Sequence, residues 1–279
     1  MKPSDILAVV VSYNGLEKTK QTVNALRAQV GHILIVDNGS AAKSRATVEQ
    51  IALGRDVSVE YLGENRGVGF ALNRGVMLAR KMGFPWLLTM DQDSLVDGSM
   101  IRSYQAVLDR EPGWLCLSPV IRGGRKTKTE GGVVGYAITS GNLVRVNLYD
   151  EVGLYDEGLF IDCIDFDFCL RVRRAGYAIC RVSGASIQHQ LGEPVDVPGL
   201  LHQFYSLHAP VRRYYMTRNY FYMVERYLLH FPAFIVKLGI SQVLLALLIV
   251  FFDPDPIASY RAIMRGLADY LARREGQCV

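Results

Sequence analysis

Short apolar runs alternate with longer amphipathic segments through the first 121 residues. The runs are apolar throughout, as in strands buried on both faces, and the segments between them repeat apolar residues about every three or four positions, as helices do. Strands that alternate with helices predict an α/β protein with a mainly parallel sheet and helices on both faces. The predicted strands are 6–12, 32–38, 57–63, 85–90 and 114–120, and the predicted helices are 16–29, 42–53, 68–82 and 98–110.

The alternation stops after residue 121. Glycine and charged residues in 123–136 indicate a hairpin or a flexible loop, and 137–146 reads as a strand. Residues 160–177 predict a helix that opens with acids, followed by one or two strands over 178–190. Helices are expected from residue 200 onward, so we divide the chain into 1–200, an α/β domain, and 201–279, a helical region.

Residues 231–252 form an apolar run that contains one lysine, Lys237. Its length suffices to cross a bilayer, but the lysine, a proline and a Ser-Gln pair also fit a helix in the membrane interface or a buried core helix. The segment 259–276 carries basic and apolar residues at helical spacing, a pattern that an anionic membrane surface attracts. We therefore expect a membrane-associating C-terminal region.

The net charge of +4 is unevenly distributed. From Leu200 to the end there are nine Lys/Arg against five Asp/Glu, so the first 199 residues are neutral overall. A neutral α/β domain gives no support for nucleic-acid binding.

Five cysteines occur without a C-x-x-C pair, so neither a disulfide framework nor a structural zinc site is indicated. The N-terminal residues 1–15 contain only a short apolar run and predict a strand in place of a secretory signal. We expect a cytoplasmic protein associated with the inner face of the cell membrane.

Ligands of open α/β sheets bind beyond the carboxyl ends of the strands. The predicted strands end in "SYNG", "DNGS", "GENRG" and "DQD", all polar. The first strand is not followed by the G-x-G-x-x-G sequence that a dinucleotide-binding domain requires. A hydride-transferring enzyme is therefore disfavoured.

Asp91 and Asp93 stand one residue apart after the fourth strand. Like charges so close raise the cost of ionising each other, which a solvated turn or a bound cation relieves. Carboxylates at such a position can hold Mg²⁺ or Mn²⁺ while the metal bridges a diphosphate and stabilises it as a leaving group. Asp37, at the end of the second strand, either caps a turn or accepts hydrogen bonds from a nucleoside.

A third acidic cluster contains Asp162, Asp165 and Asp167. Their spacing places Asp162 and Asp165 on one side of the predicted helix, with Asp167 pointing elsewhere. Acids at a helix N-terminus are also favoured by the helix dipole. A base that deprotonates a hydroxyl must be a carboxylate or an imidazole, so one of these three is the candidate.

Seven segments in this order resemble the inverting nucleotide-sugar glycosyltransferases of family two, which have the GT-A fold, and among them bacterial rhamnosyltransferases of O-antigen and cell-wall polysaccharide assembly. The segments are "VVVSYNG", "VDNGS", "ENRGVGFALNRG", "DQD", "TSGN", "FIDCIDFDFCLRVRRAGY" and "IQHQLG", and "YYMTRN" at 214–219 adds to the likeness to rhamnosyltransferases.

The resemblance implies a role for each matching residue. Asp165 would be the catalytic base, Asp93 and His189 would bind Mg²⁺ or Mn²⁺, and Asp162, Ser140 and Gly141 would contact the acceptor. By itself, a histidine after a strand is more often structural, and Arg218 fits a structural or membrane role as well as a diphosphate contact. The implied donor-binding residues are Ser12, Tyr13, Asn14, Asp37, Asn38, Asn65, Asn73, Asp91, Gln92 and Arg218. Gln92 stands where many relatives carry an acid, which leaves the metal with fewer negative ligands.

The implied reaction transfers L-rhamnose from dTDP-L-rhamnose, with inversion, to a hydroxyl of a lipid-linked saccharide. Three alternatives remain at this point: a family-two enzyme that uses a UDP- or GDP-sugar, a nucleotidyltransferase, and a non-catalytic subunit that kept the fold. A nucleotidyltransferase normally has a glycine-rich basic loop after its first strand, and "SYNGLEKTK" lacks one.

Overall fold

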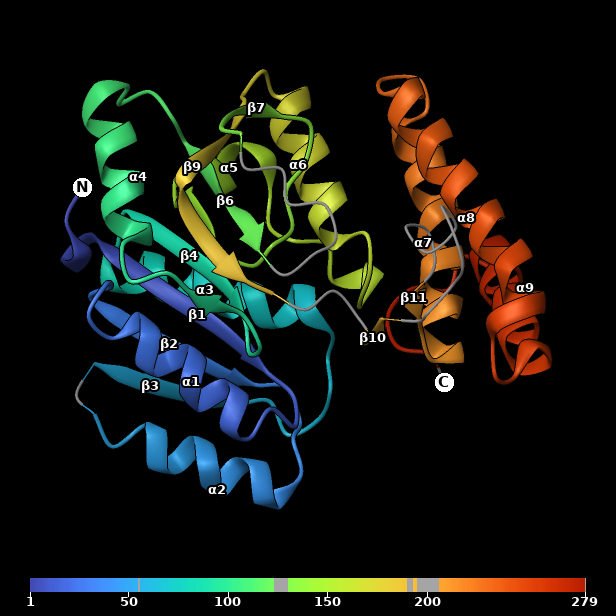
Figure 1. Cartoon of the computed structure of the whole chain (residues 1–279), viewed down its shortest axis with the longest axis horizontal. Helices are drawn as coiled ribbons and strands as arrows, with labels where there is room; N and C mark the ends of the chain where they lie inside the picture. The colour runs from blue at the N-terminus through green and yellow to red at the C-terminus, as the bar shows by residue number, and fades with distance from the viewer. Residues whose placement is uncertain (55, 123–129, 190–192, 195–205, 279) are drawn as a thin grey trace. The chain divides into compact units, whose positions relative to one another are not determined.

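The structure is a computed structural model that describes the chain apart from residues 55, 123–129, 190–192, 195–205 and 279 (Figure 1). The chain divides into two units: unit 1 comprises Met1–Glu157 and Asp165–Gln190, and unit 2 comprises 158–164 and 191–279. The predicted boundary at residue 200 lies outside the described residues. The short segment 158–164 belongs with the C-terminal helices, although it interrupts unit 1 in the sequence.

Unit 1 is built on one mixed sheet with the strand order β3-β2-β1-β4-β8-β6-β9-β5, and β7 pairs with β9 off this path. The strands are β1 (Ile6–Ser12), β2 (His32–Asp37), β3 (Val57–Tyr61), β4 (Trp86–Asp91), β5 (Leu95–Val96), β6 (Cys116–Arg122), β7 (Gly132–Val134), β8 (Asn142–Arg145) and β9 (Ile179–Gln188).

The five predicted N-terminal strands are confirmed, the first four pair parallel with one another, and β6 pairs parallel with β9. Strand β8 inserts antiparallel between β4 and β6, which makes the sheet mixed. A hairpin was one reading of 123–136, but β7 pairs with β9 and not with β6. Residues 123–129 of that segment lie outside the described residues.

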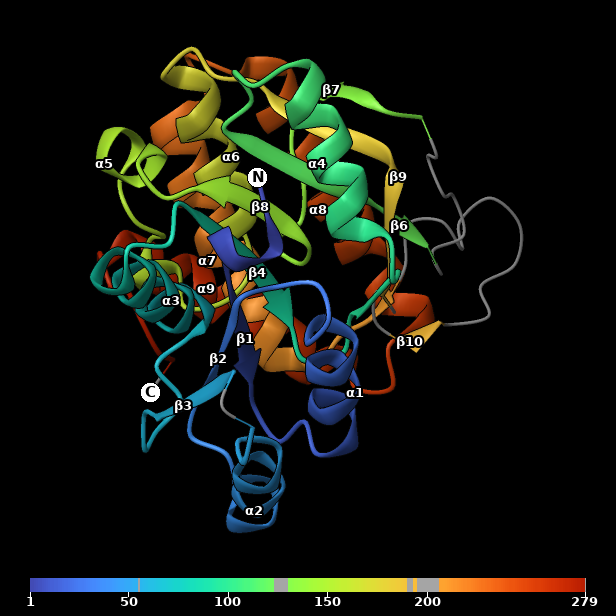
Figure 2. The ribbon, with the colours of Figure 1, turned by 90° about the vertical axis from the view of Figure 1, so that its left-hand side faces the viewer.

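Helices cover both faces of this sheet, as predicted (Figure 2). Ile6, Ala8 and Val10 of β1 share a core cluster with α1, α2 and α4. On the other face, Val9 meets α3, where a Cβ on Gly75 would lie 2.5 Å from the Val9 Cβ. All seven residues of β1 are buried because the strand is covered on both faces. The helices of unit 1 are α1 (Glu17–Leu26), α2 (Ala42–Ile51), α3 (Val68–Met82), α4 (Met100–Arg110), α5 (Leu148–Val152) and, from its second residue, α6 (Ile164–Arg174), with a 3₁₀ turn at Pro3–Asp5. A second 3₁₀ turn, Glu157–Leu159, begins at the last residue before the unit 2 segment 158–164.

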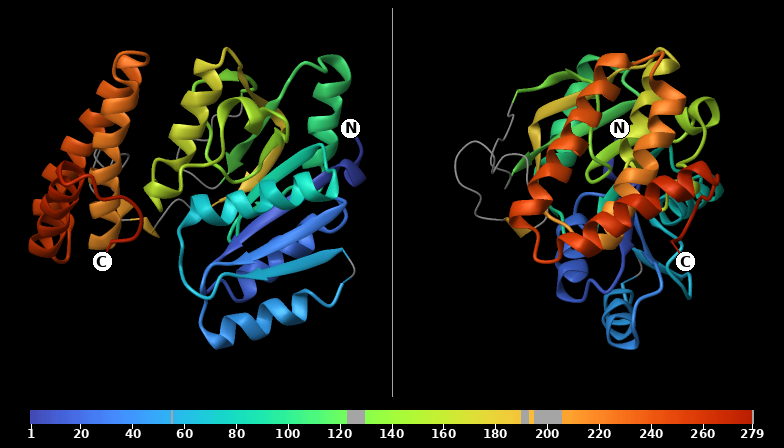
Figure 3. Two further views of the ribbon diagram at one scale, coloured as in Figure 1. Left: turned by 180° about the vertical axis from the view of Figure 1, so that it is seen from behind. Right: turned by 90° about the vertical axis from the view of Figure 1, so that its right-hand side faces the viewer.

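Unit 2 consists mainly of α7 (Pro210–Tyr227), α8 (Pro232–Phe252) and α9 (Pro256–Leu271), drawn in orange and red in Figure 3. Each helix begins with a proline, whose fixed φ suits the first helical position. The short strands β10 (Glu193–Pro194) and β11 (Ser206–Leu207) pair antiparallel.

Helix α8 is the predicted apolar run. It has 21 residues, a mean hydropathy of 2.4 over an 18-residue window, and only 17% of that window buried. Its length and composition suffice for crossing a membrane. So little burial does not fit a core helix, which was one of the three expectations for this segment.

Candidate active site

The "DQD" segment meets His189 through a short strand pairing. Strand β5 follows directly after this segment and pairs antiparallel with β9, so that Leu95 lies opposite Gln188. The residues on either side, Ser94 and His189, are therefore adjacent, and the Ser94 hydroxyl lies 2.7 Å from His189 Nδ1. His189 Nδ1 is also 3.6 Å from a carboxylate oxygen of Asp93.

Asp91, Asp93 and His189 offer ligand atoms that all lie within 4.8 Å of one another. Two carboxylates and an imidazole form a donor set that fits Mn²⁺, while Mg²⁺ would rely on the carboxylates, water and substrate oxygens. The site therefore fits the predicted metal. Asp91, expected among the donor-binding residues, lies in the same group as the two predicted ligands.

A cavity of about 340 Å³ adjoins this group. Asp93 and His189 line it together with Lys18 and Gln21 of α1 and Arg122 at the end of β6. Two cations beside two metal-ligating side chains suit an anion that also binds a metal. Neither cation was among the residues predicted from the sequence. Arg122 is the last residue of β6, so the rule that ligands bind beyond the carboxyl ends of strands could have identified it. No sequence feature distinguishes Lys18 from Lys20, the other lysine in "EKTK".

Gln92 connects the two loops at the edge of the sheet. Its side-chain amide accepts a hydrogen bond from the Tyr13 backbone N–H at 2.7 Å and donates one to the Tyr13 carbonyl at 3.0 Å. A glutamate has no N–H to donate to that carbonyl. Gln92 thus holds "DQD" against "SYNG", while the carboxylates suited to a metal come from its neighbours Asp91 and Asp93.

Asp37 is fully buried at the end of β2. One carboxylate oxygen accepts a hydrogen bond from Ser40 N at 3.0 Å, and Arg45 Nε lies 3.8 Å from the same oxygen. The other oxygen, Oδ2, is buried and has no hydrogen-bond partner among the described residues. A buried hydrogen-bond acceptor without a donor lowers the stability of the fold, and an N–H or hydroxyl group of a ligand would supply the missing hydrogen bond.

The other predicted residues of the "SYNG" loop differ in exposure. Tyr13 is 47% exposed, so its ring is accessible from solvent. Asn14 has a φ of 54° and braces the loop through Ser40 and Ala41. Ser12 is buried, and its hydroxyl lies 3.0 Å from that of Thr19.

Three predicted donor-binding asparagines form structural hydrogen bonds. The Asn38 amide donates to Asn65 Oδ1 and the Gly67 carbonyl, and Asn65 Oδ1 also accepts from Gly67 N. Asn73 donates to the Tyr155 carbonyl and accepts from Tyr155 N. These bonds fix the loops around Asp37 and α3.

Ser140 and Gly141 lie directly beside Asp91. The Asp91 N–H donates to the Ser140 hydroxyl at 3.1 Å, and the Gly141 N–H donates to the Thr89 carbonyl at 2.7 Å. Gly141 has a φ of +82°, and a Cβ there would lie 2.6 Å from Pro119. The "TSGN" and "DQD" segments are thus adjacent.

Asp165 lies in the first turn of α6. Its carboxylate accepts a hydrogen bond from Phe166 N at 2.9 Å. Cys169, one turn later on the same helix face, packs on the backbone of Ala137, three residues before Ser140. Asp167, in contrast, is buried in an ion pair with Arg171 at 2.8 Å and has a structural role.

Asp162 and Arg218 belong to unit 2. Asp162 lies before α6 with a φ of 63°, so the prediction that it shares a helix face with Asp165 is wrong. Burial raises the pKa of Asp162, and the adjacent Arg212, at 3.0 Å, opposes this shift.

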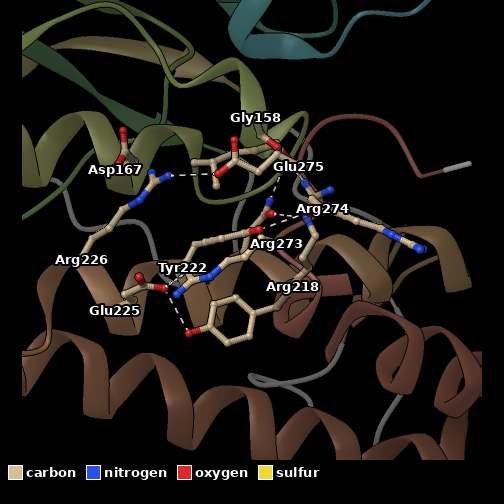
Figure 4. Close-up of polar contacts among 12 residues, drawn as sticks. Gly158, Asp167, Arg218, Tyr222, Glu225, Arg226, Arg273, Arg274 and Glu275 are labelled. Atoms are coloured by element: carbon tan, nitrogen blue, oxygen red, sulfur yellow. Dashed lines mark hydrogen bonds and ion pairs between the residues drawn. The ribbon is translucent and has the colours of Figure 1, made fainter. Parts of the chain in front are cut away.

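Arg218 is fully buried in a structural role. Its guanidinium donates to the carbonyls of Gly158, Leu159 and Gly276. Arg218 and Gly158 are labelled in Figure 4. The neighbouring Asn219 amide donates to the carbonyls of Leu159 and Asp162. The expected contact of Arg218 with a diphosphate is therefore replaced by the anchoring of 158–164 within unit 2.

Residues 7–150, more than half of the chain, match the family described as "Glycosyl transferase family 2". The chain belongs to this family. The family assignment agrees with the α/β sheet and with the carboxylates at its edge.

Among curated proteins, the chain is 27% identical to the dTDP-rhamnosyl transferase RfbF of Shigella flexneri, over 88% of this chain and 86% of that protein. It is also 28% identical to the poly-beta-1,6-N-acetyl-D-glucosamine synthase of Staphylococcus aureus, but over only 33% of this chain and 22% of that protein.

Two solved structures share the fold. TarS of S. aureus (residues 1–349) in complex with UDP-GlcNAc has a TM-score of 0.57 and 15% identity, over 98% of this chain and 74% of that chain. GalNAc-T7 with UDP, GalNAc and Mn²⁺ has a TM-score of 0.57 and 18% identity, over 77% of this chain and half of that chain. The architecture is that of GT-A glycosyltransferases.

Replacing Gln92 tests the connection between the two loops. Gln92→Glu removes the hydrogen bond to the Tyr13 carbonyl and adds a negative charge beside Asp91 and Asp93, so the free energy of unfolding should fall by about 1–3 kcal/mol. Both tryptophans, Trp86 and Trp114, lie in unit 1, so their fluorescence in a urea titration reports on this unit. The exposed Gln50→Glu is the matched control, and equal midpoints for the two variants would contradict the role of Gln92.

Proposed function

We propose that this glycosyltransferase transfers L-rhamnose from dTDP-L-rhamnose, with inversion, to a hydroxyl of a lipid-linked saccharide in bacterial surface polysaccharide synthesis. The observation that carries the proposal is the similarity to a dTDP-rhamnosyl transferase over most of both chains. The acid-imidazole group at the sheet edge supplies the chemistry that such a transfer needs.

Asp37 and Tyr13 are proposed to hold the nucleoside. The buried Oδ2 of Asp37 would accept a hydrogen bond from the imide N–H of thymine or from a sugar hydroxyl. The exposed Tyr13 ring, whose backbone is held by Gln92, would stack on the base. Uracil has the same imide, so these contacts alone do not distinguish dTDP from UDP.

Asp91, Asp93 and His189 are proposed to bind Mg²⁺ or Mn²⁺. When bound, the ion would neutralise charge on the departing nucleoside diphosphate. The Ser94 hydroxyl at His189 Nδ1 fixes the orientation of the imidazole ring. Lys18 and Arg122 would add positive charge around the diphosphate in the adjacent cavity.

Asp165 is the proposed catalytic base. Its carboxylate would take the proton of the acceptor hydroxyl, whose oxygen attacks the anomeric carbon as the bond to the diphosphate oxygen breaks. The electron pair of the broken bond leaves with dTDP. A single displacement inverts the configuration, so β-linked dTDP-L-rhamnose gives an α-rhamnoside.

The second candidate is a family-two transferase that uses a UDP- or GDP-sugar. The structures of TarS with UDP-GlcNAc and of GalNAc-T7 with UDP and Mn²⁺ favour it, because both share the fold. The likeness to the rhamnosyl transferase has the higher sequence identity, 27% against 15% and 18%, and covers 88% of this chain and 86% of that protein, so we place dTDP-L-rhamnose first. A nucleotidyltransferase is disfavoured by membership in the glycosyltransferase family.

The proposed site of action is the inner face of the cell membrane. The apolar α8 and the basic residues of α9 support attachment there, next to a lipid-linked acceptor.

Asp165→Asn tests the proposed base together with the donor. Lipid extracts are incubated with the enzyme and labelled dTDP-L-rhamnose, UDP-GlcNAc or GDP-mannose, and transfer to the lipid fraction is measured. Wild type should transfer rhamnose, and Asp165→Asn should lose about 10²–10⁴-fold in rate because the amide takes no proton. Its affinity for dTDP should stay within a few-fold, on the order of 1 kcal/mol or less.

The exposed Asp109→Asn is the control for that experiment and should retain full activity. Transfer from a UDP- or GDP-sugar alone would overturn the choice of donor. An active Asp165→Asn would overturn the assignment of the base.

Lys18→Met tests the proposed diphosphate contact. The substitution keeps the length of the side chain but removes its charge, so affinity for dTDP should fall by about tenfold while affinity for thymidine stays unchanged. Lys20→Met on the same helix is the matched control, because Lys20 pairs with Glu17 and does not line the cavity. An equal loss for dTDP and thymidine would show that Lys18 has no specific role toward the diphosphate.

A further inference from the structure

Helix α8 exposes a continuous apolar stripe. Val236, Ile240, Val243, Leu247 and Val250 are each 54–60% exposed. They follow one another at intervals of about four and three residues, the spacing of one helix face. An exposed stripe of this length on a protein surface marks a region that another apolar phase or molecule covers.

A cavity of about 300 Å³ lies beside this stripe, between α7, α8 and α9. Phe221 of α7, Val243 and Ala246 of α8, and Ile263 and Leu267 of α9 are among its lining residues. Its volume is at the lower end of the range for small-molecule pockets, and most of the lining side chains are apolar. Such a space suits a hydrocarbon chain better than a sugar or a nucleotide, whose polar groups would lose hydrogen bonds to water there.

Val243 belongs to both features, because it lines the cavity and is 60% exposed on the stripe. The cavity therefore reaches the surface next to the stripe. A hydrocarbon chain that enters at Val243 would pass from the exposed face of α8 into the space between the helices. It would cross no charged surface of α8, because the only charged residue of this helix is Lys237.

The charges around the stripe indicate what covers it. Lys237 is exposed on α8, and Arg261 and Arg265 are exposed on α9 next to the exposed Ile257 and Met264. Helix α8 has no acidic residue. Lysine and arginine at the border of an apolar face contact lipid phosphates while their aliphatic stems cover apolar surface, which favours a membrane over a second protein.

We propose that the cavity between α7, α8 and α9 binds a hydrocarbon chain, the lipid tail of the acceptor. The inference rests on the proposed function, since a lipid-linked acceptor brings such a tail to the enzyme. The tail leaves the bilayer along the α8 stripe and enters the cavity at Val243. Unit 2 thus recognises the lipid part of the acceptor.

Cavity filling tests the proposal. The full-length protein in detergent is titrated with a long-chain polyprenyl phosphate that carries a photoreactive group at the end of its tail, and labelled peptides are mapped by mass spectrometry. The probe contains no sugar, so its binding does not depend on transfer. Ala246→Phe places a ring in the cavity and should weaken binding about tenfold. Leu267→Phe fills the cavity from α9 and serves if Ala246→Phe does not fold.

Ala233→Phe is the matched control, because Ala233 is exposed on α8 and lies outside the cavity. It should bind the probe like wild type and label in α7, α8 and α9. The proposal would be overturned if wild type and the two cavity variants bound the probe equally, or if labelling were confined to the exposed stripe. It would also be overturned if the protein formed a dimer in place of a lipid complex. Binding of dTDP to the wild-type protein is measured in parallel. If the protein binds the polyprenyl probe but not dTDP, the proposed donor is contradicted and the proposed lipid site is not.

Discussion

The pairing of β5 with β9 is the constraint on which the proposed active site depends. Only two residues of β5 take part, yet they fix the register that places His189 beside Ser94 and Asp93. Asp93 comes from the edge of the parallel half of the sheet, and His189 follows the last strand of unit 1. Without this pairing, the carboxylates and the imidazole would not lie within 4.8 Å of one another. The amide of Gln92 completes the arrangement by holding the Tyr13 loop.

The two units divide the proposed recognition of substrates. In unit 1, the strand ends and helix α1 gather groups suited to a nucleotide and a cation: a buried carboxylate, a group of side chains that could hold a metal, and two cations. In unit 2, Arg218 and Asn219 use their hydrogen bonds to anchor the segment 158–164 on α7. This leaves the apolar cavity and the exposed face of α8 for the lipid part of an acceptor.

Much of unit 1 was predictable from local pattern. The strands β1, β2 and β4 are almost entirely buried and apolar, and the polar ends of β1 to β4 meet at one edge because these strands are parallel. The association of Asp93 with His189 came from the family resemblance alone, because the β5–β9 pairing joins residues too far apart in sequence for any local pattern, and Asp91 was expected only among the donor-binding residues.

Local sequence does not distinguish the purposes that one residue type can serve. Asn38, Asn65 and Asn73 match donor-binding positions, and in the structure they form hydrogen bonds with backbone groups of the surrounding loops, while their contact with the donor stays a prediction. Asp162 followed the helical spacing, yet its left-handed backbone lies outside the helix, which only the fold around it determines. The cavity lined by Lys18 and Arg122 joins α1 to β6, a proximity that no motif encodes.

Calorimetry of nucleotide binding tests the central claim most directly. The protein is titrated with dTDP, UDP and GDP in the presence of Mg²⁺ or Mn²⁺, and again with EDTA, and Asp93→Asn is titrated in the same way. The account predicts that dTDP binds most tightly, that EDTA weakens this binding, and that Asp93→Asn removes the effect of the metal. Binding that is equally tight with EDTA, or tighter for UDP or GDP, would contradict it.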